Sequence, residues 1–323
     1  MKPLLSIVIP CYNAERFLAE AVASINAQTY PAIEIILVDD GSSDGTPGLV
    51  DAMAAASRAG AGFPVRAVHQ VNGGPSLARN AGINAATGAY IGFLDSDDRW
   101  DKEKAAIQIA LMEGDSAIGL TFSGWRIIKE DGTPTSRQGV APAGDITLEA
   151  LLYTNLIATT SSVIARAPLL KEMGGFEPTM RHAEDLDLWL RIAARADVRI
   201  VSTGTVLIDR REREGQLTKQ WIKMYDGWIE ALGRIRAIAP ERVDRVARAA
   251  TAMNERYCAF LAYEAQDFEG ARDVLLRGWQ RDPLTLIKHK RTYPTTLAVL
   301  ATHLPRPVHD HLLRVARALR EGR

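Results

Sequence analysis

The sequence contains very little cysteine: two residues, Cys11 and Cys258, in a chain of 323. They lie far apart, and neither belongs to a spacing that is typical of metal ligands or of a redox pair. This scarcity excludes a fold held together by disulfides and a cysteine-rich metal site. We therefore expect two structural thiols in a reducing compartment, which predicts a cytoplasmic location.

The sequence also lacks a long hydrophobic run. A membrane-spanning helix needs about 20 apolar residues, and the longest candidate near the end of the chain, residues 295–304, is about half as long. The first ten residues, MKPLLSIVIP, are too short and too soon followed by polar residues to form a signal peptide. We expect no integral membrane segment, whereas peripheral contact with the cytoplasmic face of a membrane stays open.

An excess of one charge sign is missing as well, because the formal net charge is zero. The charges are unevenly distributed: acidic residues outnumber basic ones in residues 1–209, and basic residues outnumber acidic ones in residues 210–323. A basic half is compatible with nucleic acid, an anionic membrane or an anionic substrate. No interleaving of aromatic and basic residues and no groove-reading motif is present, so we expect no nucleic-acid partner.

A hydrophobic fraction of 47% and a charged fraction of 24% are typical of a soluble globular protein. Strands and helices are expected to alternate through the first part of the chain, which predicts an α/β domain with a mainly parallel sheet and helices on both faces. From residue 219 onward the pattern is helical throughout. We expect two domains, 1–215 and 216–323, and a loop over 134–145. The expected strands are 4–9, 34–38, 65–69, 90–94, 117–122 continuing over 124–128, 161–166, 198–201 and 206–209, and the main expected helices are 14–28, 47–59, 77 onward, 100–112, 182–196, 219–239, 241–265, 268–281 and 308–321.

Residues 255–283 in the helical part have the shape of a single tetratricopeptide-type hairpin, with a short turn at Asp267 and Phe268. One such unit cannot bury its own apolar face. It is expected to pack on the first domain or on a second subunit of a homo-oligomer. An ordinary helical hairpin would predict the same packing.

The chain is organised around residues 90–99, which read YIGFLDSDDR. An apolar run with the length of a buried strand ends in three acidic residues, Asp95, Asp97 and Asp98. Open α/β sheets bind ligands at the carboxyl ends of their strands. Three carboxylates so close together repel one another, and a divalent cation such as Mg²⁺ or Mn²⁺ is the simplest compensation. The alternative is a solvated acidic turn that caps the next helix.

Four separated segments occur in an order and spacing that resemble the inverting family 2 nucleotide-sugar glycosyltransferases. The resemblance covers about residues 4–215 and implies a GT-A fold, which is Rossmann-like with a mixed central sheet. The four segments are SIVIPCYN, IEIILVDDGSSDGT, NGGPSLARNAG with ATGAYIGFLDSDD, and GGFEP with HAEDLDLWLR.

The resemblance implies that Pro10, Tyr12 and Asp40 line a nucleobase pocket, with Asn13 at the same strand-to-helix turn. Tyr12 offers a stacking face, and a carboxylate at Asp40 matches the N3–H of uracil. We therefore favour uridine, with guanosine or thymidine as alternatives. The purely structural alternatives are that Tyr12 is a half-buried aromatic residue and that Asp40 caps a turn.

Residues 72–80 are expected to form the loop that covers the nucleotide, where Gly74 permits close approach of the backbone. Arg79, in the helix that follows, is expected to contact phosphate or base; the alternative is that it pairs with a clustered aspartate and only shapes the site. In the acidic cluster Asp97 is the expected direct metal ligand, with Asp98 in the same group. Asp95 is expected to contact ribose or a metal-bound water, and Ser96 to contribute to nucleotide binding.

The catalytic base of the family matches Asp185, and Glu184 is expected to orient the acceptor or an arginine. Their position at a helix N-terminus favours the ionised form. The sequence departs from the family where an arginine is often followed two residues later by a histidine, because Arg211 and Arg213 stand there. An arginine cannot ligate a metal but can bind a diphosphate with its fork of donors. The nearest histidine, His182, is either at the rim of the site or a plain surface residue.

Together these features predict an inverting transferase that moves a sugar from a nucleotide diphosphate sugar to a glycan or lipid-linked acceptor in cell-envelope synthesis. Two alternatives stay open: a sugar-nucleotide nucleotidyltransferase, and a non-catalytic binding protein with a scaffold tail. The first would usually need a glycine-rich basic loop after the first strand, where this chain has PCYNAERF. The basic residues 288–291, KHKR, beside the apolar 295–304 stretch predict contact with an anionic membrane or, alternatively, only a solvated basic face.

Overall fold

The computed structural model describes residues 2–180, 182–212 and 221–304. The chain divides into two compact units, the first comprising Met1–Leu148 and Leu156–Arg213 and the second comprising Glu149–Asn155 and Glu214–Arg323. The grouping of Glu149–Asn155 with the second unit has no signal in the sequence, where that segment reads as the start of an ordinary helix. Among the described residues, no helix has both the length and the apolar character to cross a membrane.

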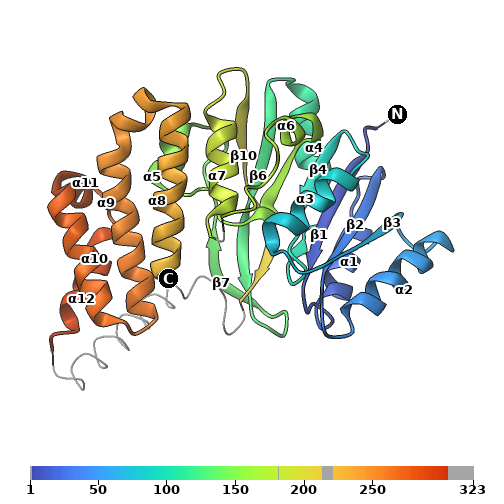
Figure 1. Cartoon of the computed structure of the whole chain (residues 1–323), viewed down its shortest axis with the longest axis horizontal. Helices are drawn as coiled ribbons and strands as arrows, with labels where there is room; N and C mark the ends of the chain where they lie inside the picture. The colour runs from blue at the N-terminus through green and yellow to red at the C-terminus, as the bar shows by residue number, and fades with distance from the viewer. Residues whose placement is uncertain (1, 181, 213–220, 305–323) are drawn as a thin grey trace. The chain divides into compact units, whose positions relative to one another are not determined.

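The first unit is built on a mixed sheet of the order β3-β2-β1-β4-β9-β6-β10-β5, with β7 on β6 and β8 on β10 (Figure 1). Strands β1 to β4 run parallel to one another, as the alternation of strands and helices predicts. The strand β9 is antiparallel to both of its neighbours, β4 and β6, and β10 is parallel to β6. The strands are β1 Leu5–Cys11, β2 Ile33–Asp40, β3 Val65–Gln70, β4 Tyr90–Phe93, β5 Arg99–Trp100, β6 Ile118–Ile128, β7 Pro134–Gly139, β8 Gly144–Ile146, β9 Val163–Arg166 and β10 Arg199–Arg211.

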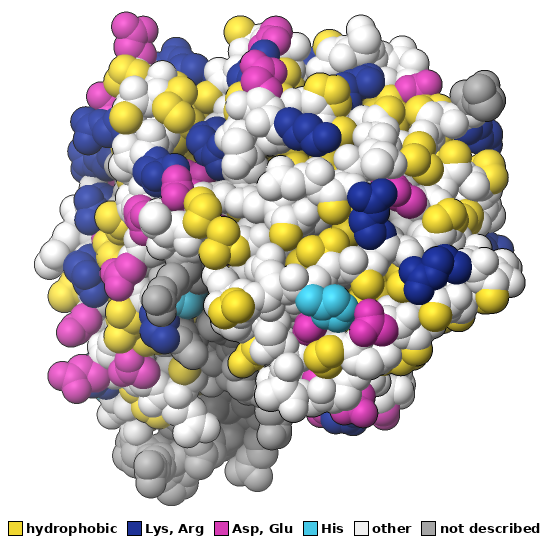
Figure 2. All heavy atoms as spheres, turned by 45° about the vertical axis from the view of Figure 1, so that its right-hand side comes forward, with side chains coloured by type: hydrophobic (Ala, Val, Ile, Leu, Met, Phe, Trp, Pro, Cys, Tyr) yellow, Lys and Arg dark blue, Asp and Glu magenta, His cyan; other side chains and the backbone are white. Residues whose placement is uncertain are grey.

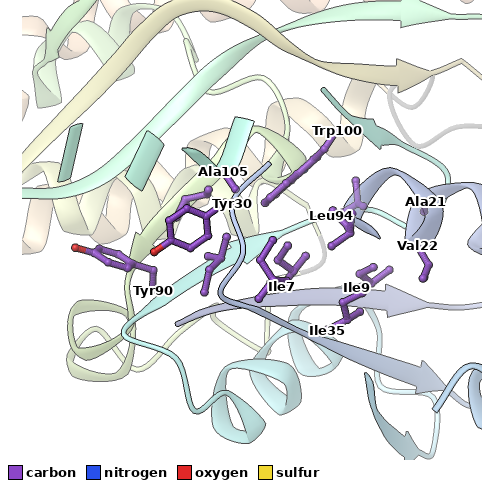
Figure 3. Packing of buried hydrophobic residues seen from close by; sticks show 14 of the residues in the cluster. Ile7, Ile9, Ala21, Val22, Tyr30, Ile35, Tyr90, Leu94, Trp100 and Ala105 are labelled. Carbon is purple, nitrogen blue, oxygen red and sulfur yellow. The ribbon is translucent and has the colours of Figure 1, made fainter. Parts of the chain in front are cut away.

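Successive residues of a strand point to opposite faces of the sheet. Both sets are largely apolar and buried in β1, so helices cover both faces. On β1, Ile7 and Ile9 belong to the core cluster that also contains residues of α1 and α4. Figure 3 shows them beside Ile35 of β2 and Leu94. The intervening Val8 faces α3, whose Gly82 leaves no room for a side chain against it. The helices of this unit are α1 Leu18–Asn26, α2 Thr46–Arg58, α3 Pro75–Ala85, α4 Lys104–Gly114, α6 Ala167–Glu172 and α7 Glu184–Ala193, and α5 Leu148–Tyr153 leads into the second unit.

Several expected boundaries are wrong in detail. Residues 134–145 are not a loop, because β7 and β8 pair there with β6 and β10. The helix expected over 100–112 begins only at Lys104, because Trp100 belongs with Arg99 to the short strand β5. The expected strand 161–166 begins with a 3₁₀ turn, Thr160–Ser162, before β9. In each case backbone pairing with a distant strand, or a local polar turn, overrides the pattern of side chains.

The second unit is helical, with α8 Trp221–Ile238, α9 Pro240–Glu264, α10 Phe268–Arg281, α11 Pro283–Lys288 and α12 Thr292–Ala301 (orange to red in Figure 1). Helices α9 and α10 form a hairpin whose turn has Gln266 at a positive φ of 62° and Asp267 as the N-cap of α10. Helices α11 and α12 are additional to the sequence-based expectation. The helix expected over 308–321 lies outside the described residues.

Charged side chains of both signs are interspersed on the face of the molecule shown in Figure 2. This distribution agrees with the formal net charge of zero. It shows that the charge imbalance between the two halves of the sequence does not produce a region of a single sign on this face.

Candidate active site

The candidate site lies at the edge of the sheet where β1, β2 and β4 end. Because these strands are parallel neighbours, their carboxyl ends meet at one edge. Tyr12 and Asn13 follow β1, Asp40 ends β2, and the acidic cluster from Asp95 follows β4. The structure thus brings the predicted nucleotide and acid groups to one edge, as their positions after strands require.

The carboxylate of Asp40 organises the glycine-rich loop. It is 3% exposed, and its Oδ1 accepts hydrogen bonds from Gln70 Nε2 at 2.6 Å and the Gly73 N–H at 2.9 Å. Its Oδ2 accepts from the Gly74 N–H at 2.8 Å. Gly74 precedes α3 and has a φ of 88°, a conformation that suits glycine. Asp40 therefore holds the loop through both of its carboxylate oxygens.

Tyr12 and Asn13 occupy the turn after β1. Tyr12 is 56% exposed, so its ring face is available for stacking. Asn13 has a φ of 49°, and its side-chain oxygen accepts from the Ser43 N–H at 2.9 Å while its own N–H donates to Ser42 Oγ at 3.0 Å. Asn13 thus joins this turn to the loop after β2. Pro10 lies inside β1 and pairs in register with a residue of β2.

One arginine joins the two acidic groups of the predicted site. Arg79 Nη2 donates to Asp95 Oδ1 at 2.9 Å, and Nη1 donates to Glu184 Oε1 at 2.9 Å. The side chain of Arg79 is 8% exposed, which places both ion pairs in a largely dry environment. Burial disfavours the charged guanidinium, but the charges of Asp95 and Glu184 outweigh this effect and raise the pKa of Arg79. The ion pair with Asp95 is the arrangement that the alternative interpretation of Arg79 predicted from the sequence.

A stack of aromatic rings supports this arginine. The ring of Phe176 lies edge-on to Phe93 at 5.3 Å and to Trp189 at 5.9 Å between centroids, and the guanidinium of Arg79 lies 5.4 Å from its centre. Asn80 fixes the backbone of Phe176 with two hydrogen bonds of 2.7 and 2.8 Å. Because Phe93 precedes the acidic cluster and Trp189 lies on α7, the stack holds the two acidic groups in a fixed relation.

Glu184 and Asp185 open α7, directly after Ala183 in the left-handed conformation with a φ of 58°. The Leu186 N–H donates to Asp185 Oδ1 at 2.7 Å. Burial, followed by the negative charge of Glu184, raises the pKa of Asp185 to about 7, and the charge of Arg79 opposes this rise. A carboxylate with such a pKa is suited to accept a proton near neutral pH.

Asp98 is the buried aspartate of its cluster, whereas Asp95 and Asp97 are partly exposed. It is 3% exposed, its Oδ2 accepts from Ser161 Oγ at 2.7 Å, and its Oδ1 accepts from the Arg211 N–H at 2.9 Å. Burial, and then the charges of Asp97 and Asp95, hold the pKa of Asp98 well above its usual range. The geometry is that of a buried link between β4, the 3₁₀ turn and the end of β10.

The described residues contain no group of three or more histidine, cysteine, aspartate or glutamate side chains placed to bind a metal. Asp95 and Asp97 are partly exposed, and their carboxylates are hard oxygen donors of the kind that Mg²⁺ and Mn²⁺ prefer. Such ions are commonly held by one or two carboxylates together with substrate phosphates. Asp95 and Asp97 therefore suit a metal ion that binds together with the diphosphate. They do not form a preformed cage of three carboxylates. Ser96, between the two, is also partly exposed.

Arg211 was expected to contact the diphosphate, which requires an exposed guanidinium with free donors, but the structure buries it. Its side chain is 1% exposed; Nε donates to the Asp97 carbonyl at 2.9 Å, Nη1 to the Glu130 carbonyl at 2.8 Å, and Nη2 to Glu20 Oε2 at 2.5 Å. These donors are engaged with protein acceptors, so contact with a diphosphate would break existing bonds. Arg213 lies outside the described residues, and His182 is half-buried.

Some residues that support the acidic cluster through hydrogen bonds were not predicted from the sequence. Ser161 Oγ accepts from the Asp95 N–H at 3.0 Å, and the Ser161 carbonyl accepts from Trp100 Nε1 at 2.9 Å. The fully buried Lys104 donates from Nζ to the Ser162 carbonyl at 2.9 Å, and burial holds its pKa well below the usual range. The run of four hydroxyl residues at 159–162 was the available signal, because such residues favour polar turns.

Comparison with known proteins assigns this arrangement to a family. The family model described as glycosyl transferase family 2 matches residues 6–173. The chain is 32% identical over 193 residues to TuaG of Bacillus subtilis, a glycosyltransferase assigned by name to teichuronic acid biosynthesis, and the match covers 59% of this chain and 72% of TuaG. Two uncharacterized glycosyltransferases of Rickettsia felis and Rickettsia conorii are much longer, and the match covers 31% of each.

Two solved structures share the fold at low sequence identity. Staphylococcus aureus TarS 1–349 in complex with UDP-GlcNAc has a TM-score of 0.58 at 20% identity, covering 86% of this chain and 92% of that one. The mannosyltransferase PcManGT of Pyrobaculum calidifontis, in complex with GDP-Man and Mn²⁺, has a TM-score of 0.61 at 17% identity, covering 96% and 83%. The expected GT-A-type architecture is confirmed.

Proposed function

Since the chain belongs to family 2 of the glycosyltransferases, we propose that it transfers a sugar from a nucleotide diphosphate sugar, with UDP favoured, to a hydroxyl of a glycan or lipid-linked acceptor. The name of TuaG supports an acceptor in cell-envelope polysaccharide synthesis. The complexes of the two structural neighbours support a UDP-sugar or GDP-sugar donor. The carboxylate of Asp40 favours uridine, because it matches the N3–H donor of uracil.

The observation that carries the proposal is the double ion pair of Arg79. Through one guanidinium, Asp95 at the end of β4 and Glu184 at the start of α7 are held in a single constellation. A transferase needs its donor-binding acids and its base at this kind of fixed separation, because the acceptor must attack from the side opposite the leaving group.

In the proposed reaction, Asp185 accepts the proton of the acceptor hydroxyl while the hydroxyl oxygen forms a bond to the anomeric carbon. The bond from that carbon to the diphosphate oxygen breaks in the same step, and the configuration is inverted. The raised pKa of Asp185 matches the task, because a base with a pKa of about 7 takes up the proton readily and is still ionised in half of the molecules at that pH. Arg79 keeps Glu184 and Asp95 in place around it.

A divalent cation fits the partly exposed side chains of Asp97 and Asp95, with Asp97 as the direct ligand. Such an ion supplies electrostatic stabilisation of the charge that develops on the leaving diphosphate. Tyr12 stacks on the nucleobase, and the loop held by Asp40 covers the nucleotide. Asp98 and Arg211 act on this site by holding the backbone of the acidic turn.

Calorimetric titration with UDP, GDP and dTDP, each with and without Mn²⁺, tests this proposal. We expect tight binding of one nucleotide, UDP, that requires the metal and is lost in Asp97→Asn. Binding without metal would remove the role given to Asp97. If none of the three nucleotides binds, the proposed donor site is wrong although the fold stands.

The base is tested separately by Asp185→Asn. This variant should bind UDP and Mn²⁺ as the unmodified protein does, because Asp185 contacts the acceptor side of the site. It should transfer no sugar. Turnover at the normal rate would assign the proton transfer to another residue.

A further inference from the structure

The second unit contains a buried arginine without a partner. Arg256 lies on α9 and is 8% exposed, and no hydrogen bond or ion pair joins it to another described residue. Its Nε is buried and unbonded. A buried charge is costly unless it is paired, so this guanidinium calls for an anion that the described chain does not supply. By contrast, its sequence neighbour Glu255 is fully buried and receives two hydrogen bonds from Arg281.

The surroundings of Arg256 add further unpaired groups. His289 Nδ1 and the hydroxyls of Thr292 and Thr296 are buried without hydrogen-bond partners. These residues belong to the start of α12 and the connection before it, which pack on α9. Burial and the positive charges of Arg256 and Arg291 lower the pKa of His289. Donors and positive charge therefore converge here with no acidic partner.

The outer face of the same segment is apolar. On α12, Tyr293, Leu297 and Leu300 form one exposed row, whereas Thr292 and Val299 face inward. Helix α11 adds two more exposed apolar side chains, and Tyr293 Oη ties the two helices by donating to a carbonyl of α11 at 2.7 Å. The exposed apolar residues of this face are Leu284, Ile287, Tyr293, Leu297, Leu300 and Leu304.

Positive charge surrounds this apolar row. Lys288, Lys290 and Arg291 are exposed, and no ion pair joins them to another described residue. Residues 283–304 contain no aspartate or glutamate. The segment thus combines an outward row of large apolar side chains, a border of cations and an inner group of unpaired donors.

We propose that α11 and α12 dock on an anionic phospholipid membrane, with the phosphate of a lipid headgroup bound by Arg256 and His289. Exposed leucines enter the acyl boundary, and the cations contact anionic headgroups, as in helices that lie in the membrane interface. Free phosphate would use the donors but leave the apolar row exposed. A second copy of this chain would use the row but would bring two identical sets of cations together.

This membrane contact goes beyond the proposed transfer reaction. Only its biological purpose rests on the proposed function. A lipid-linked acceptor is found at such a surface, so docking would raise its local concentration at the enzyme. Binding to lipid itself requires neither the donor site nor the base.

Vesicle co-sedimentation of the full chain tests the proposal. Vesicles of phosphatidylcholine are compared with vesicles that contain about one third phosphatidylglycerol, at low and high salt. We expect binding to the anionic vesicles and little binding to the neutral ones. Each cation near the surface contributes about 1 kcal/mol, so Arg291→Gln and Lys290→Gln should each weaken the partition coefficient about fivefold.

The apolar row and the inner site are tested by Leu297→Ser with Leu300→Ser, and by Arg256→Met. The first pair should reduce binding at least tenfold. Arg256→Met should also weaken it, while its thermal stability without lipid should be equal or higher because an unpaired buried charge is removed. The matched control on α8 is Ile222→Ser with Lys223→Gln, which changes one exposed apolar side chain and one exposed cation outside this face and should leave binding unchanged.

Equal binding of the control and the α12 variants would overturn the proposal, as would no binding to anionic vesicles. A dimer in light scattering that Leu297→Ser dissociates would assign the face to a second copy instead. Inorganic phosphate that stabilises the protein through Arg256, without any vesicle binding, would reduce the site to one for free phosphate. UDP binding measured on the same samples separates a failure of this proposal from a failure of the donor site.

Discussion

The backbone N–H of Arg211 donates to Oδ1 of Asp98 at 2.9 Å, which joins the end of β10 to the acidic turn after β4. The second oxygen of Asp98 accepts from Ser161 Oγ, whose hydroxyl also accepts from the Asp95 N–H. The third aspartate of the cluster therefore links three segments of the chain. Of the three aspartates, it is the one that is buried.

From this relation we predict that Asp98→Ala acts on stability. It leaves the Arg211 N–H and the Ser161 hydroxyl buried without their acceptor, and unsatisfied buried groups cost about 1–3 kcal/mol each. We expect a loss of about 3 kcal/mol in the free energy of unfolding of the first unit, measured by scanning calorimetry. The matched variant Asp97→Ala should abolish metal-dependent UDP binding, whereas Asp98→Ala should retain it in the protein that is still folded. The reverse pattern would make Asp98 the ligand.

The pKa of Asp185 predicts how transfer depends on pH. The base must be ionised to accept a proton, and a pKa raised to about 7 means that it becomes protonated as the pH falls below neutrality. We expect kcat/KM to drop about tenfold for each pH unit below 7 and to level off above it. The measurement is a pH–rate profile at a donor concentration well below saturation. A flat profile between pH 5.5 and 8 would contradict the assignment.

The fold and one half of the site follow from the sequence for identifiable reasons. The alternation of apolar runs with helical patterns places Tyr12, Asp40 and Asp95 after neighbouring parallel strands, so their shared edge is predictable. Glu184 and Asp185 lie on a distant helix, and the link to that edge is the double ion pair of Arg79 with Asp95 and Glu184. No local pattern in the sequence shows this contact, and only the family resemblance indicates that these acids belong together.

Residue roles were harder to predict than residue positions. Asp95, Asp97 and Asp98 look alike in sequence, yet Asp98 is buried by contacts with Ser161 and Arg211 that form only in the folded chain. The strands β7 and β8 have few apolar residues and exist because their backbones pair with β6 and β10. Such pairing is decided by tertiary structure and leaves little trace in composition.

The neighbours of Asp185 predict two opposite changes in its pH profile. Glu184 raises the pKa of Asp185 and Arg79 lowers it. Glu184→Gln should therefore move the inflection of kcat/KM to lower pH, and Arg79→Gln should move it to higher pH and reduce activity at pH 7 at least tenfold. Arg79→Lys retains the charge but not the fork, so it should keep the inflection near that of the unmodified protein while lowering kcat. Shifts in the same direction for both neutral variants would show that another group is being titrated.

A substitution of Arg211 separates two roles for this residue: holding the backbone of Asp97, or binding the diphosphate. Its guanidinium is buried and donates to the Asp97 carbonyl at 2.9 Å, so we predict that it holds the backbone of the metal ligand. Arg211→Met should lower the melting temperature and weaken Mn²⁺ binding, measured by calorimetry, because the Asp97 carbonyl loses its donor. UDP affinity at saturating Mn²⁺ should not change. The adjacent Arg210→Met is the control and should affect neither quantity. A diphosphate ligand would give the opposite result. Arg211→Met would then lower UDP affinity at saturating Mn²⁺ while the melting temperature stayed unchanged, because the lost contact would be with the substrate and not with the fold.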